Sequence, residues 1–207
     1  MNLVIVESPA KAKTINKYLG KDYLVLASYG HIRDLPSKNG SVDPDKNFSM
    51  LWEIDSFSKK YLKEITNAAE DSSKIILATD PDREGEAIAW HVKEVLEAKK
   101  LLKGKELERV VFNEITKSAI LNAIKNPREI DMDRVNAQQA RRILDRLVGY
   151  KISPLLWQII SANTSAGRVQ SVALKLICDL EDVIVNFVPE TYWEISGNFE
   201  NEIGLNI

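Results

Sequence analysis

The chain has 207 residues, of which 44% are hydrophobic and 28% charged, and its formal net charge is −2 at pH 7. This is an ordinary globular composition, and the net charge by itself argues against a general nucleic-acid binder. A single cysteine, Cys178, excludes an internal disulfide and a cysteine-based zinc site. No apolar run could span a membrane, and the N-terminus does not have the features of a signal peptide, so we expect a cytoplasmic protein without membrane association.

The first 130 residues alternate between strand and helix signals. Short apolar runs predict strands at 3–6, 23–28, 75–78 and 110–112. Capping residues and an apolar period of 3.6 residues predict helices at 9–19, 58–69, 87–98 and 116–126. Loops and turns are predicted at 30–48 and a charged connector at 99–108. This alternation predicts an α/β domain over 1–130, with a mostly parallel sheet and helices on both faces.

Three alternate acids lie where the strand at 75–78 hands over to the next helix: Asp80, Asp82 and Glu84. Ligand sites in α/β proteins lie beyond the carboxyl ends of the strands, and clustered carboxylates need a compensating charge. Mg2+ supplies that charge and takes carboxylate and phosphate oxygens as ligands. Arg83, between two of the acids, could bind a phosphate through two parallel hydrogen bonds. The alternative is a charged helix start, because the helix dipole alone favours acids in the first turn.

A second strand-end acid, Glu7, follows the strand at 3–6, and Lys11 comes one turn into the next helix. Parallel strands place their carboxyl ends at the same edge of a sheet, so Glu7 is expected near the acidic turn. Glu7 could equally serve as a helix cap. His31 lies in the loop after the second strand, where a lone histidine is usually solvated.

After residue 130 the strand signals stop. Asp131 is predicted to cap a long helix that ends at Gly149, and a second helix is predicted from Ser153 to Ile160. A third begins within 165–171 and runs towards Phe187. Three successive helices predict the start of an α-helical domain over 131–190. Residues 192–199 look extended, and we expect 191–207 to begin a further β-containing domain that is truncated, so that the chain is the N-terminal piece of a longer protein.

The helical segment is markedly basic. Between 132 and 175 there are seven basic residues and two acids. Arg142 and Arg146 are four residues apart and share one helix face. A solvated helix face is the usual explanation for such a run. Here the scarcity of acids favours a surface that contacts phosphates.

Four motifs occur in order along the chain. They are Glu7-Ser8-Pro9-Ala10-Lys11-Ala12, Gly30-His31-Ile32-Arg33-Asp34-Leu35, Asp80 to Glu86, and Ser165-Ala166-Gly167-Arg168-Val169-Gln170-Ser171. Together they resemble the bacterial DNA topoisomerase I family, of type IA, over essentially the whole chain. The resemblance implies a Toprim domain followed by part of a helical domain that holds single-stranded DNA. It also implies transient cleavage of one strand by a tyrosine, strand passage and resealing without ATP.

The resemblance also implies roles for individual residues. Glu7, Asp80, Asp82 and Glu84 would handle Mg2+, and Glu7 would sit beside the scissile phosphate. Lys11 would stabilise charge or protonate the leaving oxygen, and Arg83 would assist catalysis at the phosphate. The residues expected to contact DNA are His31, Arg142, Arg146, Arg168, Gln170 and Ser171. The expected partners are single-stranded and negatively supercoiled DNA, and we expect a monomer.

The nucleophile of the family is not found in this chain. None of its tyrosines stands in the family's Tyr-x-Arg-Thr-like motif; they are Tyr18, Tyr23, Tyr29, Tyr61, Tyr150 and Tyr192. We therefore predict that this chain alone does not cleave DNA. Two other classes stay open: a Toprim-containing metal-dependent nuclease or primase-like enzyme, which needs no tyrosine, and a non-catalytic DNA-binding Toprim module, which would not need the acids.

Overall fold

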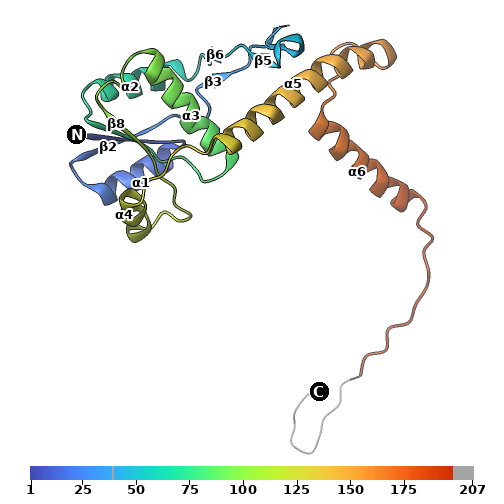
Figure 1. Cartoon of the computed structure of the whole chain (residues 1–207). Helices are drawn as coiled ribbons and strands as arrows, with labels where there is room; N and C mark the ends of the chain where they lie inside the picture. Colours follow the sequence, from blue (N-terminus) through green and yellow to red (C-terminus); the bar gives the residue numbers. More distant parts are fainter. Residues whose placement is uncertain (39, 198–207) are drawn as a thin grey trace, which may run out of the picture.

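A four-stranded parallel sheet, with strand order β2-β1-β7-β8, forms the centre of the molecule. The structure is a computed structural model that describes residues 1–38 and 40–197 (Figure 1). The strands are β1 (Asn2–Val6), β2 (Tyr23–Ala27), β7 (Lys74–Leu77) and β8 (Glu106–Arg109). β1 and β7 are continuous Val, Ile and Leu runs, as expected for strands covered on both faces. All four carboxyl ends meet at one edge of the sheet.

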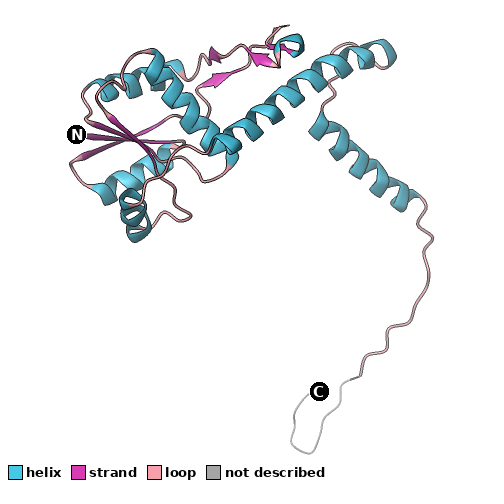
Figure 2. Ribbon diagram, in the orientation of Figure 1, coloured by secondary structure: helices cyan, strands magenta, loops and turns pink. Residues whose placement is uncertain are grey.

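Helices cover both faces of this sheet (Figure 2). On one face, α2 (Lys59–Glu70) and α3 (Arg83–Ala98) pack over Leu3 and Ile5. On the other, α1 (Pro9–Leu19) and α4 (Lys117–Lys125) pack over Val4 and Val6. The alternation along β1 follows from strand geometry, because successive side chains point to opposite faces. The predicted α/β fold with a parallel sheet and helices on both faces is confirmed.

A short insertion between β2 and α2 carries secondary structure that the sequence did not predict. β3 (Arg33–Asp34) pairs with β6 (Glu53–Ile54), and β4 (Val42–Asp43) pairs with β5 (Ser49–Met50). The 3-10 helix η1 (Pro44–Lys46) lies between them. The prediction of loops and turns over 30–48 is therefore wrong in part, because two-residue strands are too short to leave an apolar alternation in the sequence.

Two helices follow the α/β part: α5 (Met132–Ile159) and α6 (Arg168–Val185). α5 extends away from the sheet, the chain turns back at its far end, and α6 then runs outward from beneath α5 (Figure 1). None of the α6 side chains is buried, and apolar side chains on it such as Leu176 and Leu180 are exposed. Among the described residues, no helix combines the length and apolar character needed to cross a membrane.

The prediction of two helices at 131–149 and 153–160 is wrong, because α5 is one helix with Pro154 inside it. Pro154 lies close to the C-terminal end, where the lost hydrogen bond is followed by only a few residues. Gly149 is not a helix stop. A Cβ atom there would lie 3.7 Å from the carbonyl oxygen of Ala166, so this glycine faces the segment that leads into α6.

Two other predicted segments differ from the structure. The last strand occupies 106–109 instead of 110–112, because 106–109 pairs with β7 over 74–77; Lys74 on β7 also forms ion pairs with Glu106 and Glu108. The extended segment predicted at 192–199 has no assigned strand over 192–197, and 198–199 lie outside the described residues.

Candidate active site

The loops that leave β1, β2 and β7 meet at the carboxyl edge of the sheet. Backbone hydrogen bonds continue the parallel pairing beyond the strand ends: Ser28 N–H donates to Val6 O at 2.8 Å, Gly30 N–H to Glu7 O at 3.0 Å, and Ala78 N–H to Ile5 O at 2.8 Å. Three predicted site residues therefore come from neighbouring loops: Glu7 after β1, His31 after β2, and Asp80 after β7.

Lys11 lies between two of the predicted acids. Its ammonium contacts Glu7 Oε1 and Asp80 Oδ1, and the Ser8 hydroxyl that caps α1 accepts from the Lys11 backbone N–H at 3.3 Å. Partial burial lowers the pKa of Lys11, but its hydrogen bonds with Asp80 and Glu7 and their charges outweigh this, so the pKa is raised. Lys11 therefore carries a positive charge between two carboxylates.

Glu7 is the most enclosed of these acids. Its side chain is 14% exposed, compared with 44% for Asp80. Both Glu7 carboxylate oxygens are buried: the Lys11 ammonium contacts Oε1, and Oε2 has no hydrogen-bond partner among the described residues. A buried carboxylate oxygen without a hydrogen bond is costly, so Oε2 favours a bound cation or a donor from a ligand.

The acidic turn is tightly packed onto itself. Asp82 is the N-cap of α3, and its Oδ1 accepts from Gly85 N–H at 2.7 Å. The buried Thr79 hydroxyl donates to Gly85 O at 2.6 Å. A Cβ atom at Gly85 would lie 2.2 Å from the Asp80 carbonyl oxygen, so only glycine fits here. The turn holds the Asp80 backbone directly against the start of α3.

Glu84 belongs to a second group, which faces α5. Its Oε2 lies 3.2 Å from His31 Nε2 and accepts from Gln138 Nε2 at 3.2 Å. Arg141 Nη1 lies 3.5 Å from its Oε1. Arg83 is half exposed, and its ion pair with Glu84 is long, at 3.9 Å. The loop after β2, the start of α3 and the middle of α5 therefore meet at Glu84.

The structure brings together some of the predicted metal residues and separates others. Glu7 and Asp80 share Lys11, whereas Asp82 caps α3 and Glu84 faces His31 and α5. Over residues 1–38 and 40–197, no group of three or more acidic, histidine or cysteine side chains is close enough to hold a metal ion. Glu7 and Asp80 nevertheless fit a divalent cation, because they offer oxygen donors and the buried Glu7 Oε2 has no hydrogen-bond partner among the described residues.

The three predicted DNA-binding arginines all have protein partners. Arg142 Nε donates to Asp34 Oδ1 at 2.9 Å, and Arg168 Nε donates to Asp145 Oδ1 at 2.9 Å. Arg146 Nε donates to the Ser41 hydroxyl at 3.2 Å, and its guanidinium lies over the Tyr150 ring at 4.0 Å from the centroid. Counting charges along the sequence missed Asp34, because it comes from β3, outside the basic stretch. It included Asp145 but could not show that this acid pairs with both Arg141 and Arg168.

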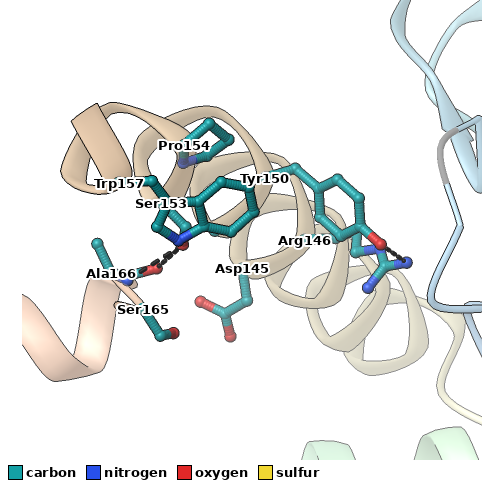
Figure 3. A pocket seen from close by; sticks show the side chains of 9 residues that line it. Asp145, Arg146, Tyr150, Ser153, Pro154, Trp157, Ser165 and Ala166 are labelled. Atoms are coloured by element: carbon teal, nitrogen blue, oxygen red, sulfur yellow. Dashed lines mark hydrogen bonds between the residues drawn. The ribbon is translucent and has the colours of Figure 1, made fainter. Parts of the chain in front are cut away.

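A pocket of about 400 Å³ lies where α5 meets the segment leading into α6 (Figure 3). Its polar and aromatic wall includes Asp145, Arg146, Tyr150 and Trp157. The Ser153 hydroxyl ties the two segments together, because it accepts from Ala166 N–H at 3.1 Å. Gln170 and Ser171 are exposed in the first turn of α6, next to this pocket wall at Ser165, whose hydroxyl donates to Gln170 Oε1 at 3.3 Å.

Sequence reasoning missed a buried histidine next to the site. His91 on α3 is 1% exposed, and its Nδ1 accepts from Arg33 Nε at 2.9 Å. Trp52 and Trp90 pack against its ring. Burial lowers the pKa of His91 to about 3, and the charges of Arg33 and His31 act in the same direction. His91 is therefore neutral, with its proton on Nε2. Its position on the apolar face of α3 was the sequence signal that could have predicted its burial.

Comparisons with known proteins agree with this arrangement. The Toprim domain model matches residues 2–115, and the DNA topoisomerase model matches residues 129–206. Toprim domains generally bind metal. The chain is 59% identical over 202 residues to a DNA topoisomerase 1 of Rickettsia typhi, a match that covers 97% of this chain and 26% of the relative. A DNA topoisomerase 1 of Zymomonas mobilis is 57% identical over 200 residues, which cover 97% of this chain and 16% of the relative.

A solved structure shows the same fold. Full-length topoisomerase I from Thermotoga maritima matches with a TM-score of 0.77 and 49% identity, over 91% of this chain and 31% of that chain. The chain thus spans about a quarter of the length of its Rickettsia relatives. The predicted motifs, the parallel sheet and both matched models point the same way, and the chain belongs to the bacterial, type IA DNA topoisomerase I family, with a Toprim domain in its first half.

Proposed function

We propose that this chain is the metal-binding and strand-binding part of a topoisomerase that relaxes negatively supercoiled DNA by cutting, passing and resealing one strand without ATP. The observation that carries the proposal is the placement of Lys11 between Glu7 and Asp80 at the carboxyl edge of a Toprim sheet. We assign 1–130 to the Toprim domain, 131–190 to a helical strand-binding segment, and 191–207 to the start of a further domain.

The proposed cofactor is Mg2+, held by Glu7 and Asp80, with Asp82 and Glu84 at the rim of the site. When bound, it would neutralise charge on the phosphoryl oxygens and favour a deprotonated 3′ oxygen for resealing. The support is the oxygen-donor set and the buried Glu7 Oε2, which has no hydrogen-bond partner among the described residues. Asp82 uses Oδ1 for the cap of α3, which leaves Oδ2 as its oxygen for the metal.

Lys11 is the proposed acid at the leaving oxygen. Its pKa is raised because hydrogen bonds and charges from Asp80 and Glu7 outweigh burial, so it is protonated when a phosphate enters the site. A leaving alkoxide needs a proton or a positive charge in the transition state. Glu7 orients this ammonium at the scissile phosphate, and Arg83, which is half exposed and only weakly paired, is free to contact a phosphoryl oxygen.

The proposed path of the single strand runs from the acidic turn along α5. His31 lies at its start beside Glu84, and Arg142, Arg146 and Arg168 lie further along. The pocket beside α5 offers Trp157 and Tyr150 for base stacking, which stabilises single strands without sequence preference. Gln170 and Ser171, exposed in the first turn of α6, would contact the strand at the far side of this pocket.

The test uses a chimera. The 202 matching residues of this chain replace the corresponding segment of the Rickettsia typhi DNA topoisomerase 1, and relaxation of a negatively supercoiled plasmid is followed on a gel. The proposal predicts Mg2+-dependent relaxation by the chimera and at least a hundredfold loss in its Lys11→Ala variant, since general acid catalysis contributes about 10²–10⁴-fold. A folded chimera that relaxes DNA equally well with Lys11→Ala contradicts the proposed role.

The chain by itself separates the proposal from the competing classes. A denaturing gel of this chain with labelled single-stranded DNA is predicted to show neither a covalent adduct nor a nick. Metal-dependent nicking by the chain alone would favour the Toprim nuclease or primase-like class. Binding of DNA that is indifferent to Asp80→Ala, combined with an inactive chimera, would favour a non-catalytic binding module.

A further inference from the structure

The guanidinium of Arg109 lies directly behind the acidic turn and holds its backbone. Arg109 is the last residue of β8, and its side chain is fully buried. Nη2 donates to the Asp80 carbonyl oxygen at 2.7 Å, and Nη1 donates to Thr79 O at 2.8 Å and Leu77 O at 3.1 Å. One rigid, planar group therefore fixes three carbonyls between the end of β7 and the first acid of the turn.

Glu86 on α3 is the counterion of Arg109, and it is equally buried. Its Oε2 accepts from Arg109 Nε at 3.2 Å and Nη2 at 3.0 Å. The same carboxylate accepts from Arg128 Nη2 at 2.7 Å and from the Asp131 N–H at 2.7 Å. Burial raises the pKa of Glu86, but the hydrogen bonds from Arg109, Asp131 and Arg128 outweigh it, so the pKa is lowered and Glu86 is ionised.

This network joins two functional parts of the chain. Asp131 is the N-cap of α5, and α5 carries Arg142 and Arg146. The Glu86 carboxylate therefore binds the start of the strand-binding helix, while its partner Arg109 binds the backbone of Asp80. Helix α3 packs directly against α5 beside this network.

Stability alone is a weak explanation for this pair. Replacing a buried ion pair with apolar side chains of similar volume is often neutral or stabilising, because both charges lose their hydration. What apolar side chains cannot do is hold three carbonyl oxygens in fixed positions. Arg109 and Glu86 are also remote from solvent, with side chains that are 0% exposed, so neither can touch a substrate.

We propose that Arg109 and Glu86 are positioning residues, which fix the backbone of Asp80 at the active edge and set its position relative to the start of α5. The proposal deepens the function above, since it rests on Asp80 being part of the metal site. Its consequence is that loss of the pair loosens the acidic turn selectively, while the sheet and its core keep their packing.

The experiment compares the paired replacement Glu86→Met/Arg109→Met with the wild-type chain and with two further variants. Arg109→Lys keeps the charge but cannot reach all three carbonyls. Lys74→Met is the control: it also removes an ion pair of β8, but at the first residue of β7, away from the acidic turn, where Lys74 Nζ lies 2.6 Å from Glu108 Oε1. Thermal unfolding shows that each variant is folded before it is tested further.

The first readout is hydrogen exchange, measured by mass spectrometry, at 79–86 and at β1. The proposal predicts that exchange at 79–86 accelerates at least tenfold more than exchange at β1, in the paired replacement and in Arg109→Lys, but not in Lys74→Met. Equal acceleration at both segments means that the pair only stabilises the fold, and it overturns the proposal. This readout needs neither metal nor DNA, so it stands even if the proposed function fails.

The second readout is the Kd for Mn2+, measured by electron paramagnetic resonance as the free ion signal. Loss of groups that orient a metal ligand typically weakens binding about 10–100-fold. The proposal predicts at least a tenfold increase in Kd for the paired replacement and no change for Lys74→Met. An unchanged Kd in the paired replacement overturns it. If the wild-type chain itself does not bind Mn2+, the proposed metal function is refuted. The hydrogen-exchange result then decides whether Arg109 and Glu86 position the acidic turn.

Discussion

Acid sensitivity of the fold should depend on one histidine. His91 is 1% exposed and accepts a hydrogen bond from Arg33, so protonation would place a second positive charge 2.9 Å from the guanidinium nitrogen. Burial, followed by the charges of Arg33 and His31, lowers the pKa of His91 from 6.5 to about 3. Between these two values the unfolded chain binds a proton that the folded chain does not, so stability falls as the pH falls.

The size of the effect follows from the two pKa values. At pH 5 an unfolded histidine is almost fully protonated and folded His91 is almost fully neutral. The resulting loss of unfolding free energy between pH 7 and pH 5 is about 2 kcal/mol, obtained by integrating proton linkage over that range. The contribution is complete above pH 6.5 and decreases until the folded pKa, near 3, is reached. Glu86, whose pKa is lowered from 4.5, acts mainly below this window.

The assay is urea unfolding of the chain at several pH values from 7 to 5, for the wild type and for His91→Gln. Glutamine can offer an oxygen to Arg33 but does not titrate. We expect His91→Gln to be less stable at pH 7 and to show a smaller loss of stability towards pH 5, by about 2 kcal/mol. Equal losses for the two proteins would show that His91 does not bind its proton differently in the folded and unfolded states, and would refute the reasoning.

Two further predictions concern the turn and the arginines. Gly85→Ala places a methyl group 2.2 Å from the Asp80 carbonyl oxygen and should cost at least about 1–3 kcal/mol in urea unfolding. Gly149→Ala meets its nearest atom at 3.7 Å and should be neutral or stabilising; equal costs would contradict the packing argument. Asp34→Asn removes the acid that holds Arg142, and should tighten binding of a short single-stranded oligonucleotide several-fold at low salt, as measured by fluorescence anisotropy. Weaker binding would mean that Asp34 positions Arg142 for the strand.

Much of the sheet could be predicted from sequence, because β1 and β7 are uninterrupted apolar runs and α1 has a cap, a first-turn proline and a terminal glycine. β8 could not, because it has only one apolar residue among three charged ones and its pairing with β7 is a long-range arrangement. The continuous α5 was also missed: Gly149 and Pro154 are the usual signals of a helix end, yet Gly149 faces Ala166 and the proline lies close to the end of the helix.

The sequence predicted which loops meet at the candidate site, but it did not predict which side-chain atoms are in contact. Parallel strand ends implied that Glu7 and Asp80 lie close together, and both contact Lys11. Glu84 instead contacts His31 and, on α5, Gln138 and Arg141. These contacts join residues far apart in the sequence, so sequence patterns could not predict them. The arginine partners were missed for a similar reason, since Asp34 is more than a hundred residues from Arg142. The role of Arg109 was missed because the strand was predicted at 110–112, which left Arg109 outside it.

The measurement that tests the central claim most directly is equilibrium binding of this chain to a short single strand and to the matching duplex, across a salt series. The proposed strand path along α5 predicts tighter binding to the single strand and a log–log salt slope of about −2, since three arginines contact phosphates and single strands give about −0.7 per contact. The Arg142→Ala variant should weaken binding and reduce the slope by about 0.7. Equal affinity for both forms, or no binding at low salt by a folded chain, would contradict the assignment of 131–190 as a strand-binding segment.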